Sequence, residues 1–462
     1  MNEKNAAREK TSFKLGFFYS FGEVGCQLSW YMVNTYLMLF YTDIIGLTAG
    51  AISMIMLIAR VWDAINDPLM GMVADRTRTR WGKFRPYITI APGFLAIFNI
   101  LTFTVFPVEG IAKIVLCLVC YIGVGMSYTA ISVSYGSLVN LIAKDSQVRM
   151  NYVSARAIGS SIIQMILSAT VMPLILTFGR SDTANAQGYF WTTVLCSIVM
   201  LPCFWLCAWK CKETVVTVNN YSHEKKPMLR SLKMMVKNKM LMITVFCVLM
   251  GTIGVMGRMS MLSYYVIYVV GSYTMIAPMF TVMTFTSFIG CLCLPFGTKL
   301  FGKRNYLIIL NVIMIAGFIM MYLMPANNIF VILGISAVIG FTNSCSNICT
   351  GMLTDCVEYG DWKYGVREEG LTFSCLGFGV KLASAVAGSA CVLLLAATGY
   401  VPNAEQTEAA KNGINAVVNL IPAACIALSI IPLFFYKLDA KMVAKISEEL
   451  AERDAKKLAE NQ

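Results

Sequence analysis

Long apolar stretches separated by short polar loops run through the whole chain. The stretches are continuous rather than alternating, so they predict helices and not the strands of a membrane β-barrel. Each is long enough to supply the roughly 20 residues that a helix needs to cross a bilayer core about 30 Å thick. We therefore predict an all-α membrane protein with twelve transmembrane helices, at 13–41, 47–75, 84–106, 112–142, 150–178, 188–209, 240–270, 274–298, 304–325, 329–356, 369–399 and 412–437.

The composition agrees with a membrane protein. Hydrophobic residues make up 57% of the chain and charged residues 13%, and the mean hydropathy is +0.67. Soluble proteins are usually about a quarter charged. The segment 1–12 is polar and the first apolar stretch is too long for a signal peptide, so we expect no cleaved leader.

The net charge of +12 follows the predicted topology. Thirty of the 37 Lys and Arg residues fall in the two tails and in every second loop, and only three fall in the other loops. Because loops rich in Lys and Arg stay in the cytoplasm, we expect both termini there. The charge is thus explained without a nucleic-acid partner.

A polar, basic segment at 210–239 divides the apolar stretches into two sets of six. We predict an N-terminal half at 1–209, a cytoplasmic linker at 210–239, a C-terminal half at 240–437 and a cytoplasmic tail at 438–462. Two parallel six-helix halves with a central linker are typical of the major facilitator fold.

Charged residues inside the second span are the first candidates for function. Arg60, Asp63 and Asp67 lie within about 60° of arc on one helix face, counting 100° per residue. A carboxylate at membrane depth is costly unless it is paired, hydrated or protonated. The two aspartates could share a proton, hold a hard cation, or form a structural ion pair with Arg60.

Five segments carry a resemblance to a known family. They are YLMLFYTDIIGL (36–47), RVWDAINDPLMG (60–71), DRTRTRWGKFRPY (75–87), DCVEYGDWKYGVREEG (355–370) and GYVPNAEQ (399–406). Through them the chain resembles the glycoside–pentoside–hexuronide:cation symporters along nearly its whole length. The resemblance implies the major facilitator fold and uptake of a sugar together with Na⁺, H⁺ or Li⁺.

The resemblance also implies a cation site. The family builds it from the aspartate pair, an intervening Asn and a Thr of the fourth span, which here are Asp63, Asp67, Asn66 and Thr129. The matching lysine of the eleventh span is Lys381, and we expect it to couple the cation site to the sugar site, together with Arg60. We hypothesise that Lys381 pairs with one of the aspartates when no cation is bound.

The implied sugar site departs from the family's melibiose-transporting branch. That branch uses an Asp of the first span, an Asp and a Trp of the fourth and an Arg of the fifth, which align with Gln27, Ser132, Gly136 and Arg156. Only Arg156 is kept, with Tyr128 nearby. Since carboxylates bind sugar hydroxyls, their loss argues against a neutral galactoside.

Arg258 offers a different substrate. It lies seven residues before Tyr265 and so shares its helix face. With Arg156 it could hold a carboxylate or sulfonate bidentately, as expected for a hexuronide or glucuronide. The alternative is that Arg258 pairs with a carboxylate such as Glu23.

Two charged loop regions resemble the latches that hold facilitator helices together. The first contains Asp75, Arg76, Lys83 and Arg85, and the second contains Asp355, Glu358, Asp361 and Arg367. We expect gating ion pairs in both, the alternative being solvated helix ends.

Other classes of function are less well supported. The alternative carrier is a lysolipid or drug transporter on the same scaffold, and a sensor without transport would leave the charges in the spans unexplained. The pairs Cys117/Cys120 and Cys345/Cys349 lie in apolar stretches and suit packing better than metal binding. We expect no enzyme activity, no cofactor or metal beyond the coupling ion, no nucleic acid and no obligate protein partner. The expected location is the cytoplasmic membrane of a bacterium.

Overall fold

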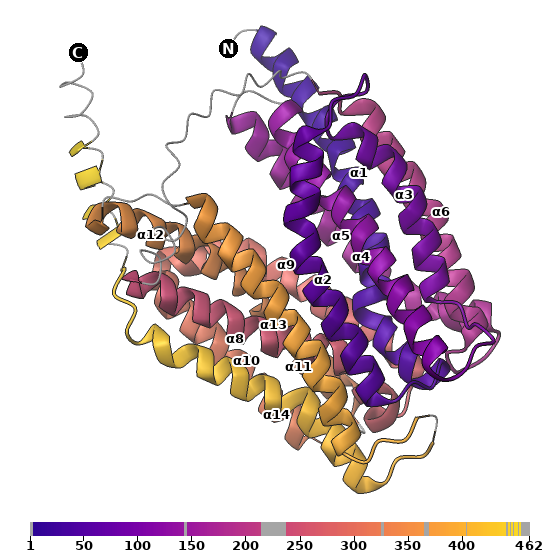
Figure 1. Ribbon diagram of the computed structural model, residues 1–462. Helices are drawn as coiled ribbons and strands as arrows, with labels where there is room; N and C mark the ends of the chain where they lie inside the picture. The colour runs from indigo at the N-terminus through magenta and orange to yellow at the C-terminus, as the bar shows by residue number, and fades with distance from the viewer. Residues whose placement is uncertain are drawn as a thin grey trace. The chain divides into compact units, whose positions relative to one another are not determined.

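The computed structural model is all-helical over the residues that it describes, apart from one isolated bridge between Thr79 and Gly82. These residues are 3–142, 146–213, 237–324, 328–364, 369–402, 404–439 and, in the tail, 442–443, 445–446, 448–450 and 452–453. Figure 1 shows the helices as long, closely packed rods. A helix satisfies its own backbone hydrogen bonds, which makes it suited to a hydrocarbon environment.

The predicted all-α fold is confirmed, and ten helical segments among the described residues are long and apolar enough to cross a membrane. The α-helices are α1 (Glu3–Leu39), α2 (Ala49–Arg76), α3 (Arg85–Thr102), α4 (Gly110–Ile142), α5 (Ser146–Gly179), α6 (Ala186–Lys210), α8 (Lys239–Tyr264), α9 (Ile276–Phe301), α10 (Lys303–Leu323), α11 (Ile329–Asn343), α12 (Ser346–Tyr364), α13 (Glu369–Ala397) and α14 (Glu408–Leu433). Two π-helical segments, η1 (Phe40–Ile44) and η2 (Tyr265–Val270), extend α1 and α8, and a 3₁₀ turn, η3 (Tyr273–Met275), precedes α9.

The predicted span at 329–356 differs most from the structure. It is divided into α11 and α12, and α12 continues to Tyr364. At the break, the side chains of Thr342 and Ser344 donate hydrogen bonds to carbonyl groups of the preceding turn. Such side-chain bonds compete with the helix ladder and bend helices.

The described helices pack into two compact units. Unit 1 contains Met1–Asn219, Leu262–Thr284 and Gly388–Lys411, and unit 2 contains Asn220–Met261, Phe285–Ala387 and Asn412–Gln462. In unit 1, α1 packs against α5 and α6, and α4 packs against α2 and α3. The division of the sequence into two six-helix halves stays a prediction.

Asp43 attaches the later segments of unit 1 to the end of α1. Asp43 is 9% exposed, and its carboxylate accepts hydrogen bonds from the hydroxyls of Tyr268, at 2.6 Å, and Tyr400. Its neighbour Thr42 bonds to Asp43 at 2.7 Å and to the hydroxyl of Tyr264 at 2.7 Å. We call Thr42, Asp43, Tyr264, Tyr268 and Tyr400 the Asp43 cluster. It joins three segments that are far apart in the sequence.

Removing one hydrogen bond of the Asp43 cluster should measurably lower the stability of the protein. Hydrogen bonds to charged groups contribute about 1.5–3 kcal/mol each. Tyr268→Phe and Tyr400→Phe should each lower the melting temperature of the purified protein, because each leaves a buried carboxylate oxygen with one bond fewer. Tyr273→Phe, at a partly exposed position beside the cluster, is the matched control. Melting temperatures equal to that of the control would contradict this role for Asp43.

Candidate ion and substrate site

The acidic residues of α2 face α4. The hydroxyl of Thr129 donates a hydrogen bond of 2.9 Å to Asp67 Oδ1. The carboxylate of Asp63 lies against Gly125, where a Cβ atom would come within 2.5 Å of Asp63 Oδ1. Gly125 therefore leaves the space that the Asp63 carboxylate fills. The four residues predicted to hold a cation come from one short stretch of α2 and the facing part of α4.

Arg60 lies at the edge of this group. Its Nη1 atom is 3.9 Å from Asp63 Oδ2, near the limit of an ion pair, and its guanidinium lies 5.1 Å from the centre of the Trp30 ring. Trp30 in turn stacks on Tyr128, with ring centres 4.6 Å apart. Arg60 therefore connects the acidic pair to an aromatic stack on α1 and α4.

The chemistry of the acidic group suits a hard cation. Carboxylate, amide and hydroxyl oxygens are the ligands that such ions prefer. The buried Nδ2 atom of Asn66 has no hydrogen-bond partner among the described residues. The described part of the chain contains no group of three His, Cys, Asp or Glu residues able to hold a metal.

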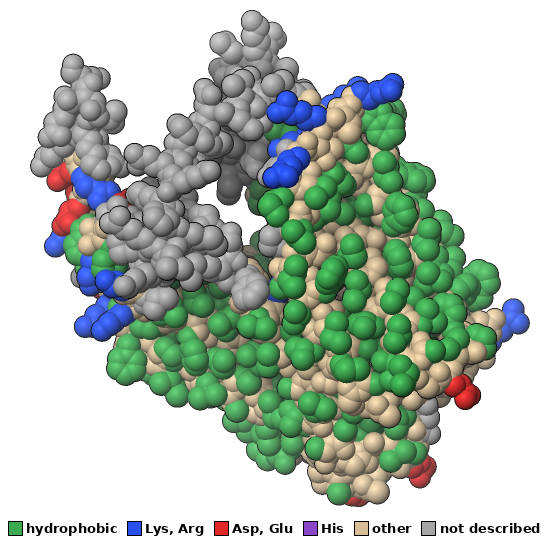
Figure 2. Space-filling view, in the orientation of Figure 1, with side chains coloured by type: hydrophobic (Ala, Val, Ile, Leu, Met, Phe, Trp, Pro, Cys, Tyr) green, Lys and Arg blue, Asp and Glu red, His purple; other side chains and the backbone are tan. Residues whose placement is uncertain are grey.

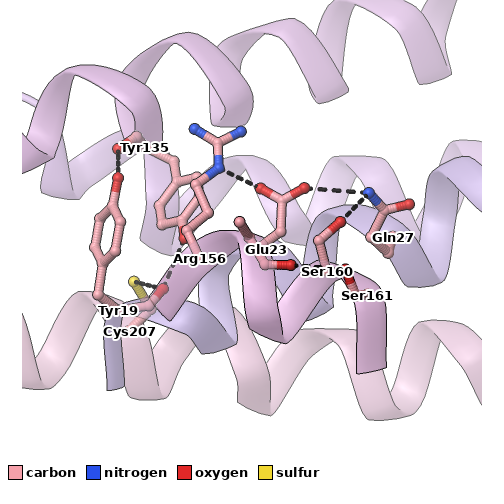
Figure 3. Close-up of polar contacts among 9 residues, drawn as sticks. Tyr19, Glu23, Gln27, Tyr135, Arg156, Ser160, Ser161 and Cys207 are labelled. Atoms are coloured by element: carbon pink, nitrogen blue, oxygen red, sulfur yellow. Dashed lines mark hydrogen bonds and ion pairs between the residues drawn. The ribbon is translucent and has the colours of Figure 1, made fainter. Parts of the chain in front are cut away.

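A second polar group joins α1 to α5 (Figure 3). Arg156 donates from Nε to Glu23 Oε2 at 2.6 Å. Gln27 donates from Nε2 to Glu23 Oε1 at 3.1 Å and to Ser160 Oγ at 2.9 Å. We call Glu23, Gln27, Arg156 and Ser160 the Glu23 cluster. Glu23 lies between Arg156 and Gln27 and compensates the charge of Arg156 (Figure 3).

A tyrosine pair supports the Glu23 cluster. The guanidinium of Arg156 lies 5.0 Å from the centre of the Tyr135 ring. Tyr135 stacks on Tyr19, and each hydroxyl donates to the backbone carbonyl of the other residue, at 2.8 and 3.0 Å. Gly22 permits this packing, because a Cβ atom there would lie 2.4 Å from the Tyr135 ring. The contacts between Tyr19 and Tyr135 thus fix the ring of α4 that the Arg156 guanidinium contacts.

The structure brings some of the predicted sugar-site residues together. Gln27 and Arg156 meet at Glu23, whereas Tyr128 stacks on Trp30. Ser132 lies on α4 one turn from Tyr128, and its hydroxyl donates to the Thr129 carbonyl at 3.5 Å.

Arg258 has a different environment. Its side chain is 2% exposed and lies 5.0 Å from the centre of the Phe318 ring in unit 2. Glu23 bonds to Arg156, and the alternative pairing of Arg258 with a carboxylate such as Glu23 stays a prediction. Tyr265, predicted to share a face with Arg258, is buried in unit 1. Lys381 lies on α13 in unit 2 with a partly exposed side chain. Its pairing with Asp63 or Asp67 stays a prediction.

The sequence interpretation named Glu23 only as a possible partner of Arg258, and it did not single out Asp43. Glu23 is a carboxylate inside the first predicted span. Like Asp63, it is costly at membrane depth unless it is paired, hydrated or protonated. Asp43 and Tyr400 lie within two of the segments that carry the family resemblance, YLMLFYTDIIGL and GYVPNAEQ.

The first predicted latch is anchored within unit 1. Glu213 accepts hydrogen bonds from the backbone N–H groups of Lys83, Phe84 and Arg85 at 2.7–3.1 Å, and so caps the start of α3. Gly82 has a φ of +117°, and a Cβ atom there would lie 2.6 Å from the Glu213 carboxyl carbon. Arg76 is exposed at the end of α2. The side chain of Asp75 lies outside the described part of the structure.

The second predicted latch contains two ion pairs in unit 2. Lys303 pairs with Asp355 at 2.7 Å, and Arg453 of the tail pairs with Asp361 at 2.5 Å. Glu358 is partly exposed on α12, and Arg367 lies outside the described residues. Both ion pairs connect α12 to other parts of unit 2. A gating role for either latch stays a prediction.

Comparison with known proteins identifies the family. Residues 18–440 match the family described as MFS/sugar transport protein. The chain is 31% identical to an isoprimeverose transporter of Lactiplantibacillus pentosus, covering 96% of this chain and 93% of that protein. It is 30% identical to a glucuronide carrier protein homolog of Escherichia coli, covering 94% of each.

A solved structure shares the fold. A bacterial homolog of the human lysosomal transporter Spinster, in an inward-facing and unoccupied conformation, has a TM-score of 0.66 at 13% identity, over 95% of this chain and 98% of that one. The protein is thus a multi-pass membrane transporter and not an enzyme. It belongs to the MFS/sugar transport family and, within that family, to the glycoside–pentoside–hexuronide:cation symporters that the five sequence segments resemble.

Proposed function

We propose that the protein is a secondary transporter that takes up a sugar together with Na⁺ or H⁺ by alternating access. The observation that carries this proposal is the pair of polar groups inside unit 1. One is a set of oxygen ligands on α2 and α4, and the other is the charge-compensated Glu23 cluster on α1 and α5. The location is the cytoplasmic membrane of a bacterium, with both termini in the cytoplasm.

Helix α4 provides the coupling between the two groups. Thr129 of α4 bonds to Asp67, and Tyr135 of the same helix supports Arg156. A cation bound at Asp63 and Asp67 would fix α4 and with it the surface that holds Arg156. Coupling of this kind is reciprocal, so the sugar would raise the affinity for the cation by the same factor.

The Glu23 cluster favours a neutral sugar. Because Glu23 already compensates Arg156, this part of the site offers donors and acceptors without net positive charge, as sugar hydroxyls require. The similarity to an isoprimeverose transporter agrees with this choice. The relative described as a glucuronide carrier protein homolog points to a uronide instead, whose carboxylate would need a positive charge that Glu23 does not already compensate.

The Asp43 cluster completes the proposed cycle. It lies beyond the end of α1, on the opposite side of the membrane from the N-terminus in the predicted topology. Its hydrogen bonds would hold the external end of the transporter closed and would break when that end opens. An opening that breaks several hydrogen bonds requires energy, which cation and sugar binding to the open form would supply.

Removing one carboxylate should uncouple the sugar from the cation. Asp67→Asn keeps the size of the side chain and loses its charge. We expect the dependence of sugar binding on Na⁺, Li⁺ or pH to disappear and uptake to fall at least tenfold. Binding by isothermal titration and uptake into membrane vesicles measure the two effects. Glu408→Gln, at an exposed residue that pairs only with nearby Lys411 among the described residues, is the control. Cation-dependent binding in Asp67→Asn would exclude this site.

The charge of the sugar can be tested at Glu23. Two nitrophenyl glycosides, a neutral xyloside and a glucuronide, differ in charge and share one aglycone. We expect wild type to bind the xyloside more tightly. In Glu23→Gln, Arg156 loses its compensating charge, so the preference should shift toward the glucuronide by about tenfold, or about 1.4 kcal/mol.

A wild-type preference for the glucuronide would contradict the neutral-sugar assignment and would favour an anionic substrate. Binding of neither glycoside, with stabilisation by lysolipid instead, would support the alternative of a non-carbohydrate carrier on the same scaffold.

A further inference from the structure

A pocket of about 240 Å³ lies on the outer surface of unit 1, away from both polar groups described above. It is formed where the loop before α3 meets the end of α6. Its lining residues are Trp81, Arg85, Thr89, Trp205, Ala208 and Trp209. One cation among three indoles is an unusual lining for a surface that faces lipid.

The guanidinium of Arg85 is held in place at this pocket. Its Nε atom donates to the Ala208 carbonyl at 2.8 Å, and its Nη1 atom donates to the Trp81 carbonyl at 3.1 Å. Among the described residues no carboxylate lies within ion-pair distance of it, because Glu213 binds backbone N–H groups instead. The guanidinium therefore keeps its positive charge and has N–H groups left for an anion.

The three indoles present about half of their surface or more to the outside of unit 1. Trp81, Trp205 and Trp209 are 51%, 50% and 62% exposed. Trp205 is oriented by a hydrogen bond of 3.1 Å from Nε1 to the Thr89 carbonyl, and Lys210 Nζ lies 4.2 Å from the centre of the Trp209 ring. Indoles gather at the depth of lipid headgroups, where one part of the ring is wet and the rest is in hydrocarbon.

Exposed apolar side chains continue from the pocket along both helices. On α3 they are Ile90, Phe94 and Ile97, and on α6 they are Leu195 and Ile198. At 1.5 Å per residue, the distance along α3 from Arg85 to Ile97 is about 18 Å, close to half of a bilayer core about 30 Å thick. Figure 2 shows Lys and Arg side chains gathered at one end of unit 1, above a surface of hydrophobic side chains.

We propose that this pocket binds an anionic phospholipid, with the lipid phosphate on Arg85 and the acyl chains along α3 and α6. The positive charge selects the headgroup, and the length of the apolar surface matches one leaflet. A soluble anion would use only the first of these features, and a zwitterionic lipid would gain little from the charge. The proposal is independent of the transported substrate.

Native mass spectrometry of the purified full-length transporter tests the proposal. Dioleoyl phosphatidylglycerol and dioleoyl phosphatidylcholine, which share their acyl chains, are offered in equal amounts. We expect at least fivefold more bound phosphatidylglycerol. This preference should be lost in Arg85→Gln and reduced in Trp209→Leu. Trp191→Leu changes an indole that is 48% exposed near the other end of α6, and it should leave the preference unchanged.

Several outcomes would overturn the proposal. They are equal retention of the two lipids by wild type, an unchanged preference in Arg85→Gln, and an equal loss in Trp191→Leu. Inorganic phosphate at millimolar concentration is tested for thermal stabilisation in parallel. If it stabilises wild type as much as phosphatidylglycerol does, the pocket is an anion site and not a lipid site. If Arg85→Gln does not fold, the test is the comparison of Trp209→Leu with Trp191→Leu, of which only Trp209→Leu should reduce the preference for phosphatidylglycerol.

Discussion

The ion pair between Arg156 and Glu23 compensates a positive charge in the interior of a bundle that is otherwise mostly apolar. A charge at membrane depth is tolerated when it has a partner or reaches water. Further polar contacts surround that pair. Gln27 and Ser160 extend it along α1 and α5, and Tyr135 supports the guanidinium from α4. A charge on α2 also has a partner, because Thr129 of α4 bonds to Asp67.

In the function proposed above, these contacts give one bundle separate places for an ion and a sugar. The acidic pair and the Glu23 cluster use different faces of the bundle, and α4 contributes a residue to each. Thr129 and Tyr135 are six residues apart on that helix, so a small rotation of α4 changes both environments. Helices in close-packed bundles move as rigid bodies more easily than they deform. This arrangement makes α4 the natural element to transmit binding energy.

The fold could be predicted from the sequence because it follows from strong local signals, and a similar local signal leads to the cation site, which stays a prediction. Continuous apolar stretches indicate helices, and two carboxylates on one helix face at membrane depth have few explanations. The Glu23 cluster was harder to predict, because its members come from helices that the sequence does not place together. Glu23 and Arg156 are 133 residues apart, and no periodicity connects them. At the break between α11 and α12 the sequence offers only the hydroxyl side chains of Thr342 and Ser344, a signal too weak to predict an interruption of an apolar stretch.

The chemistry of the Asp43 cluster has a consequence for the conditions under which the protein works. Its contacts join a carboxylate to phenol and alcohol hydroxyls rather than to lysine or arginine. Dissolved salt screens exposed pairs of opposite charges over about 10 Å at 0.1 M, but it has little effect on a buried hydrogen bond from a neutral donor. The ends of α1, η2 and α13 are therefore joined by contacts whose strength does not depend on ionic strength. The half-exposed Lys303–Asp355 pair of unit 2 lacks this protection. A rise in salt concentration would thus weaken the Lys303–Asp355 ion pair more than the hydrogen bonds of the Asp43 cluster.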